Sequence, residues 1–148
     1  VKRVEKLIGN ESFFLTYGDG VSDINIEELL KEHHRNGGTI TMTSVQPDGR
    51  FGTFESGSDG KVSKFLEKPR GDGSWINGGY FVCEPEVFNY IKNGDATIFE
   101  QEPLQEMASD GELYTYQHHG FWKCMDTLKD KNDLNEMCQA DAAPWVSW

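Results

Sequence analysis

The stretch Phe13-Phe14-Leu15-Thr16-Tyr17-Gly18-Asp19-Gly20 carries the strongest fold signal in this 148-residue chain. Its first five residues form a short apolar and aromatic run, and the two glycines around Asp19 end that run. Such a run is typical of a strand covered on both faces in a parallel sheet. Ligands bind beyond the carboxyl ends of strands in such sheets, and the sequence places Asp19 at that position.

Helix and strand signals alternate in the rest of the chain. Asn25 is placed as a helix N-cap with Glu28 three residues later, and Gly37-Gly38 ends that helix. The sequence also predicts strands over residues 39–45, 76–83 and 113–117, a hairpin of 51–55 and 61–66, and helices over 85–94, 99–108 and 128–138. Interleaved strands and helices predict an α/β fold, and the hairpin predicts a mixed sheet.

Length and charge narrow the function classes. A chain of 148 residues with 36% hydrophobic residues fits a single folded domain rather than a disordered segment. The net charge of -11 disfavours nucleic acid and anionic membrane surfaces as partners, because both need a basic footprint. We find no apolar run of bilayer length and no signal-peptide pattern, so a soluble, cytoplasmic protein is expected. Cys83, Cys124 and Cys138 form no CxxC pair, and reduced thiols are expected.

Two aspartates are candidate Mg²⁺ ligands. Asp19 lies between glycines after an apolar strand, and Asp126 ends an aromatic segment just before the last predicted helix. Mg²⁺ prefers hard oxygen ligands and takes one or two protein carboxylates, with water and phosphate completing its shell. The alternative is that Asp19 is a turn residue and Asp126 is a helix N-cap, both favoured roles for aspartate.

Two further segments are candidate binding positions. Glu67-Lys68 ends the second hairpin strand, where the lysine could contact a phosphate and the glutamate could accept sugar hydroxyl groups. A solvated charge pair on an edge strand is the alternative. Asn77-Gly78-Gly79 combines a side-chain amide with accessible backbone, which suits a polyhydroxylated ligand but could equally be a β-bulge.

The histidine pairs and terminal tryptophans receive no catalytic role. His33-His34 and His118-His119 are sequence neighbours, and neighbours do not share a face of a helix or a strand. A zinc site is therefore not expected. Trp145 and Trp148 are expected to dock onto the fold or a neighbouring subunit.

A series of motifs in order resembles the sugar nucleotidyltransferase family, and within it the glucose-1-phosphate cytidylyltransferases. The resemblance covers essentially the whole chain, and the order of the motifs is more specific than any one of them. The motifs are Leu15-Thr16-Tyr17-Gly18-Asp19-Gly20, Gly49-Arg50-Phe51-Gly52, Glu67-Lys68-Pro69, Trp75-Ile76-Asn77-Gly78-Gly79-Tyr80-Phe81, Gly120-Phe121-Trp122 with Met125-Asp126-Thr127, and Ala143-Pro144-Trp145.

This resemblance implies a Rossmann-like mixed sheet flanked by helices and a transfer reaction. The reaction joins CTP and α-D-glucose 1-phosphate to give CDP-glucose, a precursor in bacterial surface polysaccharide synthesis, and pyrophosphate. By resemblance, Asp19 and Asp126 are Mg²⁺ ligands, and Lys68 contacts the sugar phosphate. The implied substrate-binding positions are Arg50, Gly52, Glu67, Lys68, Asn77 and Gly78.

The chain also departs from the family pattern. The family opens with a glycine-rich GGxGTR loop and a downstream PKP motif, and neither is present here. Residues 1–148 are therefore expected to be the C-terminal portion of a single nucleotidyltransferase domain, inactive alone and homo-oligomeric when complete. Two alternatives remain: a non-catalytic sugar or sugar-phosphate-binding module on the same scaffold, and a nucleotidyltransferase that uses another base or sugar.

Overall fold

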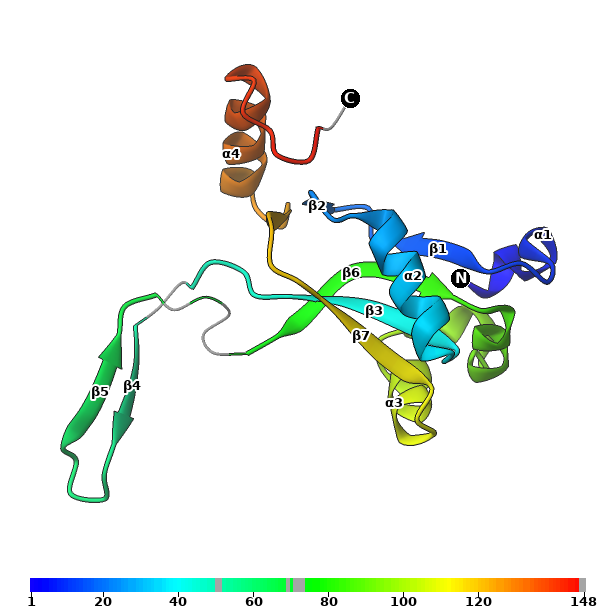
Figure 1. Ribbon diagram of the computed structural model, residues 1–148, viewed down its shortest axis with the longest axis horizontal. Helices are drawn as coiled ribbons and strands as arrows, with labels where there is room; N and C mark the ends of the chain where they lie inside the picture. Colours follow the sequence, from blue (N-terminus) through cyan, green and yellow to red (C-terminus); the bar gives the residue numbers. More distant parts are fainter. Residues whose placement is uncertain (50–51, 69, 71–73, 147–148) are drawn as a thin grey trace.

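The structure, a computed structural model, describes residues 1–49, 52–68, 70 and 74–146. Its centre is a four-stranded sheet (Figure 1). The strands are β1 (Phe13–Thr16), β3 (Ile40–Val45), β6 (Ile76–Cys83) and β7 (Leu113–His118), in the order β1-β6-β3-β7. β3 and β7 run parallel, whereas β6 runs antiparallel to both β1 and β3. The predicted α/β class with a mixed sheet is confirmed.

β1 is an antiparallel strand with alternating burial, so the prediction of a parallel strand covered on both faces is wrong for this chain. Phe14 pairs with Val82 of β6 and is 50% exposed, while Phe13 on the opposite face stacks on Phe88. An apolar run indicates that a strand is buried, but it does not encode the direction of its partner.

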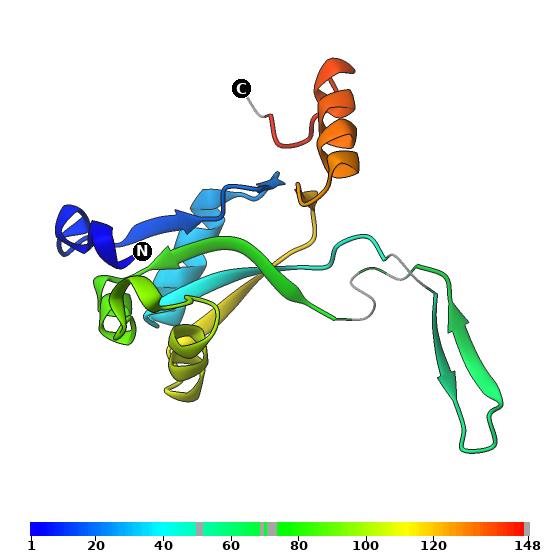
Figure 2. The same ribbon diagram turned by 180° about the vertical axis from the view of Figure 1, so that it is seen from behind.

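Different helices cover the two faces of the sheet (Figures 1 and 2). α2 (Ile26–Asn36) packs on one face, where His33 Nδ1 lies 2.9 Å from Thr41 Oγ1 of β3. The 3-10 helix η3 (Pro85–Tyr90) and α3 (Glu102–Ser109) pack on the other. That second face holds the hydrophobic core, formed by Ile40, Phe81, Cys83, Val87, Phe88, Ile91, Phe99, Leu104 and Met107.

Local hydrogen bonds set the ends of α2 as predicted. The side chain of Asn25 accepts a hydrogen bond of 3.0 Å from the backbone N–H of Glu28. Gly37 ends the helix with φ 69°, a left-handed conformation that glycine adopts without steric cost.

The last helix, α4 (Leu128–Gln139), begins one residue later than the N-cap alternative for Asp126 requires. Thr127 is the N-cap, and it forms a capping box with Asp130. That alternative role for Asp126 is therefore wrong, and its carboxylate is not used to begin the helix.

The remaining helices are short. The helix predicted over residues 85–94 is the 3-10 helix η3, and α3 begins at Glu102, three residues later than predicted. Pro103 lies in the first turn of α3, where its missing N–H costs nothing. The other short helices are η1 (Lys2–Val4), α1 (Glu5–Ile8) and η4 (Gly94–Ala96).

Two small antiparallel pairs extend from the central sheet. The predicted hairpin is confirmed as β4 (Thr53–Ser56) and β5 (Val62–Leu66), which project away from the rest of the chain (Figure 1). It forms a separate sheet, so the mixed character of the central sheet comes from β6 instead. The second pair, β2 (Gly20–Ser22) and β8 (Trp122–Cys124), was not predicted.

Two further expectations concern the described residues as a whole. None of their helices has the length and apolar character needed to cross a lipid bilayer. Cys83, Cys124 and Cys138 are free thiols, as predicted.

Candidate functional site

The β2–β8 pair brings Asp19 and Asp126 together from distant parts of the sequence. We call this pair the ribbon. Gly20 lies opposite Cys124, and the backbone N–H of Met125 donates a 2.8 Å hydrogen bond to the carbonyl oxygen of Asp19. Asp19 and Asp126 therefore lie near the same end of the ribbon, the first just before β2 and the second two residues after β8.

Both carboxylates remain available at this end. Asp19 and Asp126 are exposed, and within the described ranges neither forms an ion pair with lysine, arginine or histidine. Asp126 Oδ2 accepts a weak hydrogen bond from the Cys124 thiol at 3.1 Å. Burial and this contact raise the pKa of Cys124 to about 11, so the thiol stays protonated as the donor. Two unneutralised carboxylates fit a hard cation such as Mg²⁺.

The glycine pair of β6 lies against the ribbon. Trp122 Nε1 donates a 2.8 Å hydrogen bond to the Gly78 carbonyl oxygen, and the Tyr80 hydroxyl donates one of 2.9 Å to the Gly20 carbonyl oxygen. A Cβ at position 78 would lie 2.9 Å from Val45 Cγ1, so only glycine fits there without displacing β3. The ribbon is thus joined to the central sheet by hydrogen bonds from side chains to backbone carbonyl oxygens.

Asn77 takes part in a β-bulge, one of the two roles left open for it. The β3–β6 register shifts between Met42 and Ser44, opposite the Asn77-Gly78-Gly79 segment. Asn77 Oδ1 accepts a hydrogen bond from Gly79 N at 2.8 Å, and its Nδ2 donates one of 3.1 Å to the Tyr17 hydroxyl. The bulge re-aims the backbone toward the ribbon, so a structural role for Asn77 and a binding role are compatible.

The Tyr17 hydroxyl, which accepts the hydrogen bond from Asn77, has a raised pKa and stays protonated. Burial is the largest cause that raises the pKa of Tyr17, followed by its hydrogen bond to Glu100 and the negative charges of Glu100 and Asp19. The hydrogen bond from Asn77 acts in the opposite direction and is outweighed. Tyr17 is therefore a neutral donor beside Asp19 across the accessible pH range.

The hairpin residues form a second group. Glu67 and Lys68 are exposed, with Lys68 Nζ 3.9 Å from Glu67 Oε1, which matches the solvated charge pair weighed for them. A Cβ at Gly52 would lie 3.1 Å from Glu67 Oε2. Among the residues that the structure describes, no hydrogen bond or ion pair joins Glu67 or Lys68 to the ribbon. Arg50 lies outside the described residues.

The base of the hairpin is nevertheless connected to the sheet beside the ribbon. Arg70 donates a 3.3 Å hydrogen bond to the carbonyl oxygen of His119, just after β7. The rings of Trp75 and His119 meet edge to face, with centroids 5.2 Å apart. His118, in contrast, contacts Asp23, so the two histidines face different partners as predicted.

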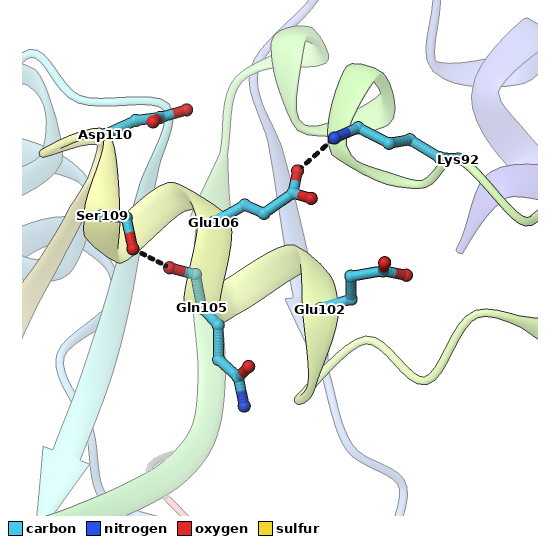
Figure 3. A pocket seen from close by; sticks show the side chains of 6 residues that line it. All are labelled: Lys92, Glu102, Gln105, Glu106, Ser109 and Asp110. Atoms are coloured by element: carbon cyan, nitrogen blue, oxygen red, sulfur yellow. Dashed lines mark hydrogen bonds and ion pairs between the residues drawn. The ribbon is translucent and has the colours of Figure 1, made fainter.

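A recess lined by polar residues lies elsewhere on the structure. This recess, of about 400 Å³, is lined by Lys92 and by four polar residues of α3 with the adjacent Asp110, including Glu102 and Glu106 (Figure 3). Lys92 forms an ion pair with Glu106 across this recess. None of the predicted site residues lines it, so it is not part of the candidate site.

Sequence reasoning missed three contributors to the site. Trp122 and Tyr17 were noted only within motifs, and Glu100 was not singled out. Their roles depend on contacts between distant segments, and the sequence offers no local signal for such contacts. Of the terminal tryptophans, Trp145 stacks on Phe121 at 5.3 Å as predicted, and Trp148 lies outside the described residues.

Comparison with known proteins identifies the family. Residues 1–139 match the model of the family described as "Nucleotidyl transferase". The chain belongs to the nucleotidyl transferase family. This membership agrees with the resemblance carried by the sequence motifs, and it covers both aspartates of the ribbon together with Lys68.

Individual nucleotidyl transferases are similar to this chain to different degrees. A glucose-1-phosphate cytidylyltransferase of Salmonella typhimurium is 46% identical over 149 residues, which span all of this chain and 57% of the relative. A mannose-1-phosphate guanyltransferase of Aspergillus oryzae is 31% identical over 93% of this chain and 39% of the relative. The chain thus spans 57% or less of the length of these two curated relatives.

The solved structures show the same fold. HddC from Yersinia pseudotuberculosis superposes with a TM-score of 0.66 at 18% identity, over 93% of this chain and 60% of that one. At that identity the likeness concerns the arrangement of strands and helices alone.

Proposed function

We propose that the protein carrying this chain transfers a cytidylyl group from CTP to α-D-glucose 1-phosphate, giving CDP-glucose and pyrophosphate in a Mg²⁺-dependent reaction. The observation that supports the proposal is the ribbon, because the chain at Asp19 and the chain at Asp126 reach the same end of it and neither carboxylate forms an ion pair within the described ranges. The 46% identity to a glucose-1-phosphate cytidylyltransferase supports the choice of substrates.

The chemistry requires no protein nucleophile. An anionic oxygen of the sugar phosphate attacks the α-phosphorus of CTP, a new P–O bond forms, and the bond to the β-phosphate oxygen breaks to release pyrophosphate. The protein mainly aligns the two substrates and offsets their negative charge. Mg²⁺, when held by Asp19 and Asp126, would supply positive charge to the phosphate oxygens.

In this proposal Lys68 offsets charge on the sugar phosphate and Glu67 accepts sugar hydroxyl groups. Both side chains are more than 60% exposed and are paired only with each other at 3.9 Å, so a ligand can displace that contact at little cost. Asn77 and Gly78 offer amide and backbone groups to the sugar, and Gly52 lies beside Glu67. Arg50, two residues before Gly52 in the sequence, is part of the same proposal.

The remaining family properties are part of the same proposal. The working enzyme is a cytoplasmic homo-oligomer, its product feeds bacterial surface polysaccharide synthesis, and residues 1–148 act as the C-terminal portion of one nucleotidyltransferase domain. The glycine-rich loop that the sequence lacks would position the triphosphate, so this chain alone is expected to release no pyrophosphate.

A complementation experiment tests the proposal. The chain is expressed alone, and then with the part of the Salmonella typhimurium relative that lies outside the matched region, and pyrophosphate release from CTP and glucose 1-phosphate is measured. Activity is expected only on co-expression. Release from other nucleotide and sugar-phosphate pairs is measured in parallel, because the mannose-1-phosphate guanyltransferase relative represents a different base and sugar.

Substitution of the aspartates tests the metal ligands. Asp19→Asn and Asp126→Asn are each expected to lower turnover of the co-expressed enzyme by at least ~10²-fold, since each removes a charge that holds the cation. Asp141→Asn is the matched control, because Asp141 is exposed with φ 53°, a conformation that asparagine tolerates. Turnover near that of the control in either ribbon variant would remove the metal assignment.

A further inference from the structure

The ribbon has a second end, opposite the one that carries Asp19 and Asp126. There the chain leaves β2 at Asp23 and enters β8 from Gly120 and Phe121. His118, the last residue of β7, lies beside this end. The proposed function assigns none of these residues a role.

His118 and Asp23 form a partly buried contact at this second end. His118 Nε2 lies 2.8 Å from Asp23 Oδ1 and 3.2 Å from the Phe121 carbonyl oxygen. Because a carboxylate and a carbonyl oxygen only accept hydrogen bonds, Nε2 must carry the proton. The His118 side chain is 9% exposed and that of Asp23 is 37% exposed, so the contact is sheltered from water on the histidine side.

Hydrogen bonds to the Phe121 carbonyl oxygen also join the end of β2 to the start of β8. The Phe121 carbonyl oxygen accepts hydrogen bonds from Ser22 Oγ at 2.8 Å and from Asp23 N at 3.2 Å. A Cβ at Gly120 would lie 2.4 Å from Asp23 Oδ1 and 2.8 Å from His118 Cε1. The approach of Asp23 to His118 therefore requires glycine at position 120.

The ribbon itself is too short to hold its register. Each strand contributes three residues, and an isolated two-stranded pair is marginal in water even when it is longer. A slip by one residue would move a side chain by about 3.3 Å along the strand and turn it to the other face. Such a slip would separate Asp19 from Asp126.

We propose that His118, Asp23 and Gly120 form a latch that, together with the hydrogen bonds of Trp122 and Tyr80, fixes the register of the ribbon and thereby the relative position of the two site carboxylates. His118 and Asp23 are positioning residues, since they lie at the far end from the carboxylates. The consequence for metal binding rests on the proposed function, whereas the consequence for ribbon register does not.

The chain contains its own matched control for this inference. His33 is also a buried histidine beside a carboxylate, with Nε2 2.9 Å from Glu84 Oε1 and a side chain 1% exposed. It lies between α2 and the sheet, and its hydrogen-bond partners are Thr41 and Glu84, neither of which belongs to the ribbon. Breaking either the His118–Asp23 pair or the His33–Glu84 pair should lower the stability of the chain, whereas only the His118–Asp23 pair should affect the register of the ribbon.

The test compares four variants: His118→Asn, His118→Gln, His33→Asn and His119→Asn. A glutamine amide nitrogen can reach the place of Nε2 and keep the hydrogen bond, whereas an asparagine is too short. The first readout is hydrogen exchange of the Met125 amide, which donates to Asp19, relative to the amides of α3, a helix that forms no hydrogen bond with His33 or His118 among the described residues. It is measured in the 148-residue chain and in the co-expressed assembly.

The second readout is the affinity of the assembly for Mn²⁺, measured by electron paramagnetic resonance, with the Mg²⁺ concentration for half-maximal activity beside it. His118→Asn is expected to reduce Met125 protection and to weaken Mn²⁺ binding about tenfold, the scale for residues that orient metal ligands. His118→Gln is expected to restore both. His33→Asn and His119→Asn should leave the ratio of Met125 protection to α3 protection unchanged.

Two results would overturn the latch. One is unchanged Met125 protection in His118→Asn, and the other is an equal loss in His33→Asn, which would mean that any destabilisation loosens the ribbon. Reduced protection with unchanged Mn²⁺ affinity would refute the link to the metal and retain the register role. An assembly without activity would refute the proposed function, while the exchange ratio would still decide the latch.

Discussion

Replacement of Gly78 by alanine tests whether the close contact between β6 and β3 holds Gly78 in the position where its carbonyl oxygen binds Trp122 of the ribbon. The added Cβ would lie 2.9 Å from Val45 Cγ1 and 3.1 Å from the Thr43 carbonyl oxygen, both in the buried strand β3. Neither neighbour can move freely, because Val45 is 1% exposed and the carbonyl belongs to a central strand. The strands must therefore separate locally.

The sign of the effect follows from two opposing magnitudes. Overpacking of a buried site costs roughly 1–3 kcal/mol. Against this, alanine in a strand interior gains about 0.5–1 kcal/mol over glycine through the lower entropy of its unfolded chain. Gly78 has no positive φ to add a backbone cost, so the clash decides. A net loss of about 1–2 kcal/mol in the free energy of unfolding is expected.

Gly20→Ala is the matched control, because Gly20 also lies near the Trp122 indole nitrogen. A Cβ at Gly20 would lie 3.7 Å from Trp122 Nε1 and 3.9 Å from the Gly78 carbonyl oxygen, which are ordinary contacts. This variant keeps the entropic gain without a clash, so its stability should equal or slightly exceed that of the unsubstituted chain.

Urea unfolding followed by tryptophan fluorescence measures both variants. With a slope of about 2 kcal/mol per molar urea, Gly78→Ala should lower the midpoint by roughly 0.5–1 M, and Gly20→Ala should not lower it. Trp122 should also show altered emission in Gly78→Ala, because its hydrogen-bond acceptor is displaced. Equal midpoints for the two variants would refute the reasoning from contact distances.

Further predictions concern the hairpin lysine, the thiols and the pH dependence of stability. Lys68→Met should weaken binding of glucose 1-phosphate to the co-expressed enzyme, by about 1.5–3 kcal/mol, and leave CTP binding unchanged in calorimetric titrations. Equal losses of affinity for both substrates would mean that Lys68 does not act specifically on the sugar phosphate. Iodoacetamide at pH 8 should alkylate the exposed Cys138 well before Cys124. Burial and the hydrogen bond to Asp126 raise the pKa of Cys124 to about 11, which leaves roughly one Cys124 thiol in a thousand as thiolate at this pH. Mass spectrometry gives the order of alkylation, and comparable rates for the two thiols would contradict the prediction. Burial acts to raise the pKa of Glu84, but hydrogen bonds from Ser12 and His33 outweigh burial and hold it below 4.5. The stabilising effect of Glu84 is therefore present above pH 4.5 and lost as the pH falls through the lowered pKa. Glu84→Gln should accordingly flatten the fall in the free energy of unfolding at acid pH. An unchanged dependence of that free energy on pH below 4.5 would show that Glu84 does not contribute.

Elements that depend on local hydrogen bonds were predicted well from the sequence. The Asn25 cap, Glu28 and Gly37 define α2, and the turn Gly57–Lys61 closes the predicted hairpin. In each case the residues that end an element lie within a few positions of the atoms they bond. Local sequence is therefore sufficient for these elements.

The partner and direction of β1 could not be predicted in this way. Its apolar run correctly indicates a strand, but Phe14 pairs antiparallel with Val82 of β6, far along the chain. Direction depends on which distant segment supplies the neighbour, and an apolar run is compatible with either.

The candidate site shows the same division most clearly. The sequence by itself determined the chemical types, since Asp19, Asp126 and Lys68 were singled out from their positions in motifs. Only the tertiary structure decided that the two aspartates lie near one end of the ribbon, while Lys68 follows β5 of the separate β4–β5 hairpin. The physical reason is that three-residue strands carry no detectable periodicity, and their pairing depends on contacts such as Trp122 with Gly78 that join segments far apart in the chain.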